Sequence, residues 1–203
     1  MRVPFLSRTL LSAIWCESRM SREIHWSVGV KAREIAAVVV AWAMGSTQTP
    51  ACEAARTMCR LVDKLLSRHS ILYRSVILRV RMEIGCNSTD ILLTVADGLF
   101  SDQRINFGRI CALYAFVAQY AVVLKDIGAS DTGISALSTT LGDYVELHLG
   151  IWMLQHGSWQ GFVENFPEPY DWDLLLLKGV VIMTFTVACL LTVGGLFSIA
   201  YDG

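Results

Sequence analysis

The chain has 203 residues, a formal net charge of −1 and a pI near 6.4. This balance provides no basic field for nucleic acid, so binding to DNA or RNA is not expected. Hydrophobic residues make up 54% of the chain and charged residues 17%, whereas soluble domains average about 45–50% and about 25%. The apolar excess predicts a segment that faces lipid, beside one domain of ordinary size.

An extension of unknown role, residues 1–30, opens the chain. After it, Pro50 is the only proline before Pro167, and no stretch alternates with the period of a strand, so an all-α domain is predicted over residues 31–172. The link at residues 44–51 is too short for a long disordered loop. Helices are expected at 31–43, 51–68, 70–84, from a cap at Thr89 or Asp90 to Phe100, and at 107–124, 134–149 and 152–166, the last broken at Gly157.

Residues 107–124 are apolar on nearly every face, which predicts a buried central helix capped by Asn106. Arg109 is the exception, because a cation is costly to bury and the first turn of a helix already carries partial positive charge. Either Arg109 has a structural partner within the chain, or it receives an anion from another molecule. We expect its side chain to reach outward and take up an incoming aspartate.

Gly179–Ala200 contains 22 residues without a charge. As a helix at about 1.5 Å per residue it would span roughly 33 Å, enough to cross a bilayer. Residues 173–203 are therefore expected to form a C-terminal transmembrane tail anchor that inserts after synthesis, with the helical domain in the cytosol. The alternative is a core helix that is wholly buried in the protein.

Motifs for catalysis and metal binding are missing from the sequence. It contains no GxSxG, P-loop or HExxH pattern, and its histidines lack the spacing of metal ligands. Asp143, Glu146 and His148 are expected to form a solvated face of their helix. The sequence therefore predicts a protein that is not an enzyme and uses no cofactor or metal.

Two motifs carry a family resemblance. Residues 106–110, NFGRI, resemble the NWGR signature in the first homology motif of the Bcl-2 apoptosis-regulator family, with Phe107 in place of tryptophan, and LFSD at 99–102 resembles its ELFRDG lead-in, lengthened by one residue. WMLQHGSWQGF at 152–162 is similar to the second motif, WIxxxGGWxxF. The resemblance implies a Bcl-2-like helical bundle around the buried central helix, with a tail anchor. The second-motif positions are Trp152, Gly157, Trp159 and Phe162.

A third motif is the death-motif helix of the same family. Its apolar spacing around an aspartate fits residues 58–65, but Val62 stands where that helix usually has glycine. A valine hinders close approach to another protein's groove, so this chain is expected to receive such a helix and not to donate one. An ordinary amphipathic core helix is the alternative. The short 44–51 link further resembles the avian Nr-13 type and its viral copies. The third-motif residues are Met58, Leu61, Asp63 and Leu65.

The resemblance implies an inhibitor of apoptosis that binds the death-motif helices of pro-apoptotic relatives and blocks permeabilisation of the mitochondrial outer membrane. Arg109 would pair with the partner's aspartate, Asn106 would cap its helix and touch the ligand, and Gly108 would leave room for the partner's backbone. Trp152, Trp159 and Phe162 are expected to pack. The protein would be anchored on the cytosolic face of the mitochondrial outer membrane or of the endoplasmic reticulum. The implied groove residues are Val95, Leu99, Asn106, Gly108, Arg109, Ala112, Phe116 and Phe166.

Two other interpretations remain open at the level of sequence. A pro-apoptotic executioner of the same fold would release the 107–124 helix and its partner helix into the bilayer and form a pore. An unrelated tail-anchored helical adaptor would bind no death-motif helix at all.

Overall fold

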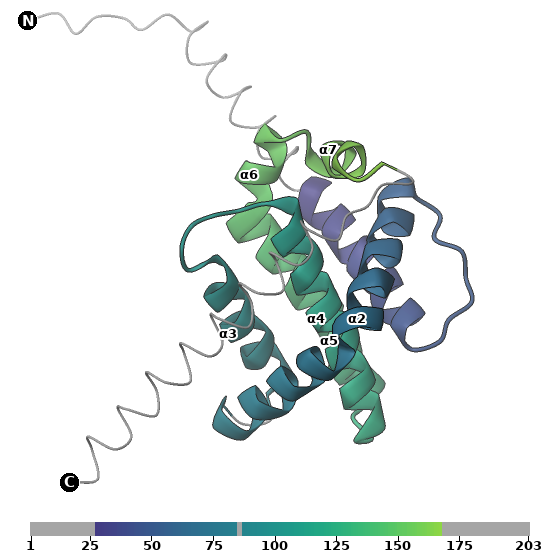
Figure 1. Ribbon diagram of the computed structural model, residues 1–203, viewed down its shortest axis with the longest axis vertical. Coiled ribbons are helices and arrows are strands. Elements are labelled where there is room, and N and C mark those ends of the chain that lie inside the picture. Colours follow the sequence, from purple (N-terminus) through teal and green to yellow (C-terminus); the bar gives the residue numbers. More distant parts are fainter. Residues whose placement is uncertain (1–26, 85–86, 168–203) are drawn as a thin grey trace, which may run out of the picture.

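The structure is a computed structural model that describes residues 27–84 and 87–167. Every regular element in these ranges is helical, and the helices pack as a bundle (Figure 1). The predicted tail anchor and most of the N-terminal extension lie outside the described residues. In chain order the elements are a helix over residues 27–43, α2 (Glu53–Ile84), α3 (Ser88–Phe100), α4 (Phe107–Asp126), α5 (Asp131–Tyr144), a π-helical turn (Val145–Leu149), α6 (Gly150–Gln155) and α7 (Ser158–Asn165).

Helix α4 runs through the middle of the bundle (Figure 1). Within residues 27–84 and 87–167 it is the one helix long and apolar enough to cross a membrane, yet 94% of its most apolar stretch is buried inside the protein. A helix that is apolar all round is stable in water only when neighbours cover every face. The prediction of a buried central helix is therefore confirmed.

The long helix α2 is two helices joined at a break. His69 has φ −131° and ψ 17°, which is not helical, so the predicted division into 51–68 and 70–84 is confirmed. The first half packs against α4 and buries Met58, Leu61 and Val62 completely. The break lets the second half, residues 70–84, leave in a new direction (Figure 1).

The starts of α3 and α5 differ from the prediction because of their caps. Helix α3 begins at Ser88 and is capped by Asn87, whose side-chain oxygen accepts a hydrogen bond from the Thr89 N–H at 3.2 Å. The expected caps, Thr89 and Asp90, are already inside the helix, because an asparagine upstream satisfies the free N–H groups first. Helix α5 likewise begins at Asp131 and not at residue 134, because Ser130 caps it.

The helix over residues 27–43 closes one side of the bundle. Val28, Ala32 and Ile35 on it are buried, and two of its carbonyl oxygens accept hydrogen bonds from buried side chains. The Tyr114 hydroxyl donates to the Ala32 carbonyl at 3.0 Å, and the Trp159 indole N–H donates to the Val28 carbonyl at 3.1 Å. The helix thus includes residues before the predicted start at residue 31.

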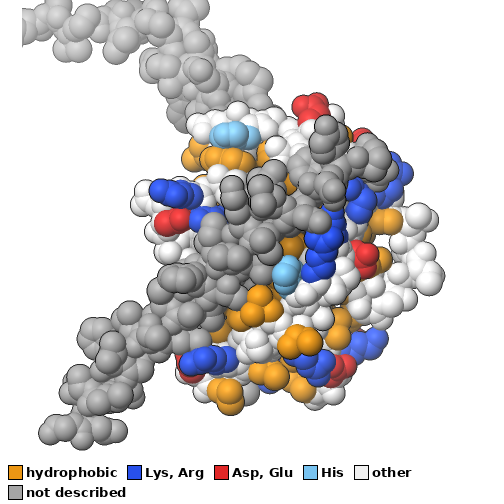
Figure 2. Space-filling view, viewed as in Figure 1, with side chains coloured by type: hydrophobic (Ala, Val, Ile, Leu, Met, Phe, Trp, Pro, Cys, Tyr) orange, Lys and Arg blue, Asp and Glu red, His pale blue; other side chains and the backbone are white. Residues whose placement is uncertain are grey.

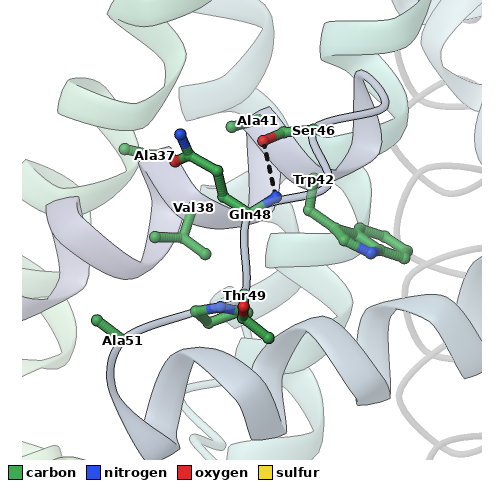
Figure 3. Close-up of a pocket in the computed structure, with 9 residues that line it drawn as sticks. Ala37, Val38, Ala41, Trp42, Ser46, Gln48, Thr49 and Ala51 are labelled. Carbon is green, nitrogen blue, oxygen red and sulfur yellow. Dashed lines mark hydrogen bonds between the residues drawn. The ribbon is translucent and has the colours of Figure 1, made fainter.

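The link that follows this helix is short, as predicted, since α2 begins at Glu53. It folds back over the helix and leaves a half-open pocket of about 350 Å³, lined by Ala37, Val38, Trp42 and Pro50 among others (Figure 3). The Gln48 N–H donates to the Ser46 hydroxyl across the turn at 3.4 Å. None of the residues that line this pocket is a predicted groove residue.

Candidate functional site

The predicted site begins at the N-terminus of α4. Asn106 is extended, with φ −155° and ψ 159°, and its side-chain oxygen accepts a hydrogen bond from the Arg109 N–H at 2.9 Å. This is the geometry of an N-cap, so the predicted role of Asn106 as the cap of the central helix is confirmed. The cap fixes where the first turn of α4 starts and hence where Arg109 lies.

Arg109 does not reach outward. Only 2% of its side chain is exposed, and its guanidinium forms a two-pronged ion pair with Asp102: Nη1 donates to Oδ1 at 2.5 Å and Nη2 donates to Oδ2 at 2.7 Å. Nη1 also donates to the Leu99 carbonyl at 3.2 Å and to the Arg104 carbonyl at 2.6 Å. The arginine therefore has a partner within its own chain, and the expectation of an outward-reaching side chain is corrected.

Asp102 lies in the loop between α3 and α4, which contains the additional residue noted in the sequence. The backbone of this longer loop turns at Gln103, whose φ of +57° lies in the left-handed region. The Asp102 carboxylate also accepts a hydrogen bond from the Arg104 N–H at 3.1 Å. The Arg109 guanidinium, followed by the Arg104 N–H, holds the pKa of Asp102 well below its usual range. The Asp102 side chain is still 44% exposed, so solvent reaches the outer side of a pair whose cation is buried.

The other predicted groove residues lie on α3, on α4 and just after α7. The five apolar ones are each at most 2% exposed. A ligand helix can contact these apolar side chains only if what covers them moves aside, whereas the Asp102 carboxylate is within reach at once. Gly108 is buried in the first turn of α4, next to Arg109. The buried apolar residues are Val95 and Leu99 on α3, Ala112 and Phe116 on α4, and Phe166 after α7.

The second-motif residues form an aromatic cluster against the start of α4. Phe107 makes edge-to-face contacts with Trp152 and Phe162, at centroid distances of 5.0 and 5.7 Å. Gly157 separates α6 from α7 with a φ of +80°, which confirms the predicted break. These rings act by packing, as expected, and they brace Phe107, the residue that stands in place of the motif's tryptophan.

The third-motif helix is an integral part of the core. Met58, Leu61 and Leu65 are buried, at 0 to 2% exposure, whereas Asp63 is exposed to solvent. Val62 is also fully buried against the domain. A helix used in this way would have to leave the core before it could serve as a ligand.

One cluster was missed by sequence reasoning. Arg33, on the first described helix, donates to the Asp143 carboxylate at 2.7 Å and to the Glu146 carboxylate at 2.7 Å. Asp143 and Glu146 were expected to face only solvent, yet the Glu146 side chain is 17% exposed. The available signal was a pair of acids three residues apart on one helix face, together with an arginine on a helix that is mostly apolar.

The described residues thus form a helical bundle around a buried, Asn-capped central helix that is braced by the aromatic cluster. A family model described as "Apoptosis regulator proteins, Bcl-2 family" matches residues 58–159. The chain belongs to the Bcl-2 family.

Among its relatives is the anti-apoptotic protein NR13 of Coturnix japonica, which is 31% identical over 141 residues, 68% of this chain and 78% of that protein. The apoptosis regulator BAX of Mus musculus is 26% identical over 103 residues, 48% of this chain and 51% of that protein. A crystal structure of the zebrafish pro-survival protein NRZ in complex with Bad BH3 matches with a TM-score of 0.70 and 24% identity, over 72% of this chain and 99% of that one. The resemblance to the avian Nr-13 type is thereby confirmed.

Proposed function

We propose that this protein inhibits apoptosis by binding the death-motif helix of pro-apoptotic Bcl-2 relatives at the N-terminus of α4. The observation that carries the proposal is the ion pair between buried Arg109 and half-exposed Asp102. A buried cation with one accessible carboxylate partner is suited to recognise a second carboxylate of the same chemistry. In the bound state the partner's aspartate takes the place of Asp102 on the guanidinium.

This exchange has a low cost because the charge of Arg109 stays paired throughout. If the ligand brought an uncharged residue to this position, Arg109 would keep Asp102 and the ligand would gain nothing there. If Arg109 lost both carboxylates, a buried charge would be left unpaired, at a cost of about 2–5 kcal/mol. The site therefore selects a ligand helix that carries a carboxylate at this register position.

The remaining contacts follow from a helix laid into a groove. The ligand's apolar residues, spaced i, i+3 or i+4, and i+7, enter between α3 and α4 once Val95, Leu99, Ala112 and Phe116 are uncovered. Gly108, next to Arg109, allows the ligand backbone to come close. Phe166 lies at one end of this region, where the Arg60 guanidinium donates to its carbonyl at 2.8 Å.

The same fold accommodates an executioner that forms pores, and this is the second candidate. Two observations favour the inhibitor: the match to an anti-apoptotic relative extends over 68% of the chain, and Val62 sits fully buried where a donor helix requires a small residue. The uncharged segment Gly179–Ala200 supports a tail anchor, and with it a location on the cytosolic face of the mitochondrial outer membrane and the endoplasmic reticulum.

The binding step is tested by titrating a fluorescent death-motif peptide with the full chain, next to the same peptide with its aspartate changed to asparagine. We expect the aspartate peptide to bind at least tenfold more tightly, which corresponds to about 1.4 kcal/mol. Equal binding of the two peptides would remove Arg109 from recognition. Binding of neither would favour the unrelated-adaptor interpretation.

The direction of the activity is tested separately in cells given a death stimulus. Expression of the chain should reduce the release of cytochrome c from mitochondria, and Arg109→Ala should abolish the reduction. An increase in cytochrome c release would identify the executioner instead.

A further inference from the structure

The second half of α2, residues 70–84, buries one face and exposes the opposite one. Tyr73, Ile77 and Val80 are 0 to 4% exposed and pack into the core. On the outer side, Ile71 is 85% exposed, Leu78 46% and Met82 80%. A single exposed apolar residue needs no explanation, but three large ones on one short helix do.

These three residues form one line along the helix, which we call the apolar stripe. At about 100° per residue, Ile71, Leu78 and Met82 fall within an arc of roughly 40°. The exposed Ser75 fills the gap between Ile71 and Leu78 on the same side. The stripe is therefore continuous over about three turns of helix.

Arginines border the apolar stripe on both sides. By the same helical geometry, Arg74 and Arg81 lie about 60–80° to one side of its centre and Arg79 lies about 80° to the other. Residues 70–84 contain three arginines and a single acid, Glu83, in a chain whose net charge is −1. Figure 2 shows hydrophobic and basic side chains gathered on the lower part of the molecule, where Figure 1 places this half of α2.

Two of these arginines have acidic neighbours that hold them weakly. Arg74 pairs with Asp126 at 3.3 Å, with side chains 52% and 47% exposed, and Arg79 pairs with Glu83 at 3.6 Å, with side chains 63% and 45% exposed. Exposed pairs at such distances contribute little to stability and exchange readily for other anions. Both guanidinium groups are thus available to a negatively charged surface without disturbing the fold.

We propose that the apolar stripe docks on the surface of a membrane that carries anionic phospholipid. The second half of α2 would lie in the plane of the bilayer, with Ile71, Leu78 and Met82 at the boundary of headgroups and acyl chains. Arg74 and Arg79, one on either side of the stripe, would bind lipid phosphates. This surface goes beyond the proposed function, because none of its residues is a groove residue.

The composition of the surface favours lipid over a protein partner. The core of a protein interface is depleted of charge and enriched in aromatic residues, whereas the stripe contains no aromatic side chain and has arginines along both of its borders. The stripe is narrow and aliphatic, and arginine side chains lie directly beside it. A narrow apolar line between two basic flanks is the pattern of a helix that lies on an anionic bilayer.

The experiment places a photoreactive benzoylphenylalanine in the full chain in place of Ser75, inside the stripe. The chain is produced by cell-free translation in the presence of vesicles. One set of vesicles is phosphatidylcholine containing about a third phosphatidylserine, and the other is phosphatidylcholine alone. A matched probe replaces Ser135, an exposed serine on α5. Because the readout is cross-linking at one position, membrane insertion of other segments contributes equally to both probes.

We expect the probe at position 75 to cross-link phospholipid on the anionic vesicles at least fivefold more than the probe at 135. The adduct should fall at least fivefold with Ile71→Ser plus Met82→Ser, with Arg74→Gln plus Arg79→Gln, or on vesicles without phosphatidylserine. The matched controls, Leu147→Ser plus Ile151→Ser and Arg56→Gln plus Arg104→Gln, change exposed residues elsewhere and should leave the adduct unchanged. Equal lipid adducts at 75 and 135, or an adduct of twice the protein's mass that marks a second copy, would overturn the proposal.

Discussion

The carboxylate of Asp102 accepts two hydrogen bonds from the guanidinium of Arg109, at 2.5 and 2.7 Å. The two residues lie seven positions apart, on either side of the turn into α4. Arg109 stands in the first turn of that helix, where the peptide dipoles disfavour a cation, and Asp102 brings a negative charge to the same helix end. One carboxylate thereby compensates both the buried arginine and the helix terminus.

Removing the charge of Asp102 should make the protein less stable and a better receptor. In Asp102→Asn the buried Arg109 lacks a full counter-ion, so we expect the free energy of unfolding to fall by about 1–3 kcal/mol. The affinity for a death-motif peptide should rise about tenfold, because the ligand's aspartate no longer competes. Urea unfolding and fluorescence polarisation measure the two effects. The peptide with asparagine serves as the control and should gain nothing; weaker binding of the aspartate peptide would mean that Asp102 is not a competitor.

Removing Arg109 should affect both stability and binding. Because the Arg109 side chain is buried and bonded to Asp102, Leu99 and Arg104, we expect Arg109→Ala to lower the free energy of unfolding by about 2–4 kcal/mol. Peptide affinity should fall tenfold or more. Binding is measured where circular dichroism shows the variant folded, and Arg104→Ala, in the same loop, should stay within about 0.5 kcal/mol of the parent.

The Asp102–Arg109 pair should make the free energy of unfolding depend on pH in the acid range. The pKa of Asp102 is lowered in the folded state by its bond to Arg109, whereas in the unfolded chain it is about 3.9. The contribution is therefore fully present above the unfolded value and is lost as the pH falls below about 4 toward the folded value. Urea midpoints measured between pH 6 and pH 3 should fall more steeply for the parent than for Asp102→Asn. Parallel curves would contradict this assignment.

Replacing Gly142 in α5 by alanine should lower the stability of the protein, whereas the same change at Gly133 in this helix should not. A Cβ at residue 142 would overlap the Arg33 side chain and lie 2.9 Å from the Arg33 backbone nitrogen. Gly142→Ala should therefore cost about 2 kcal/mol or more and disturb the Arg33 ion pairs. At Gly133 the nearest atom to such a Cβ is the Ser130 hydroxyl at 3.4 Å, so Gly133→Ala should be neutral or stabilising by up to about 1 kcal/mol. Thermal unfolding of the two variants compares them directly; equal losses would contradict a close contact between Gly142 and Arg33.

Much of the fold was predictable because it depends on patterns within single helices. The cap at Asn106, the break near His69, the break at Gly157 and the burial of residues 107–124 are all local consequences of side-chain type and spacing. The helix starts at Ser88 and Asp131 were misplaced for the opposite reason, since several residues able to cap stand in succession and the one furthest upstream that closes a turn takes the role.

The residues of the site were predictable from the sequence, but the partner of Arg109 was not. Sequence identified Arg109 as a cation that needs an anion, but which anion it has depends on how the loop between α3 and α4 folds back. The additional residue in that loop, taken up at Gln103, brings Asp102 over the guanidinium. The pairing of Arg33 with Glu146 spans 113 residues, and no local pattern determines which elements of a bundle become neighbours.

The hydrogen bond from the Trp159 indole to the Val28 carbonyl sets a limit on how short a working version of this protein can be. A fragment that starts at residue 31, the predicted domain boundary, would leave a buried N–H without an acceptor and remove Val28 from the core. A gene product or an engineered fragment that begins later than residue 28 should therefore accumulate poorly, even though every motif residue is still present.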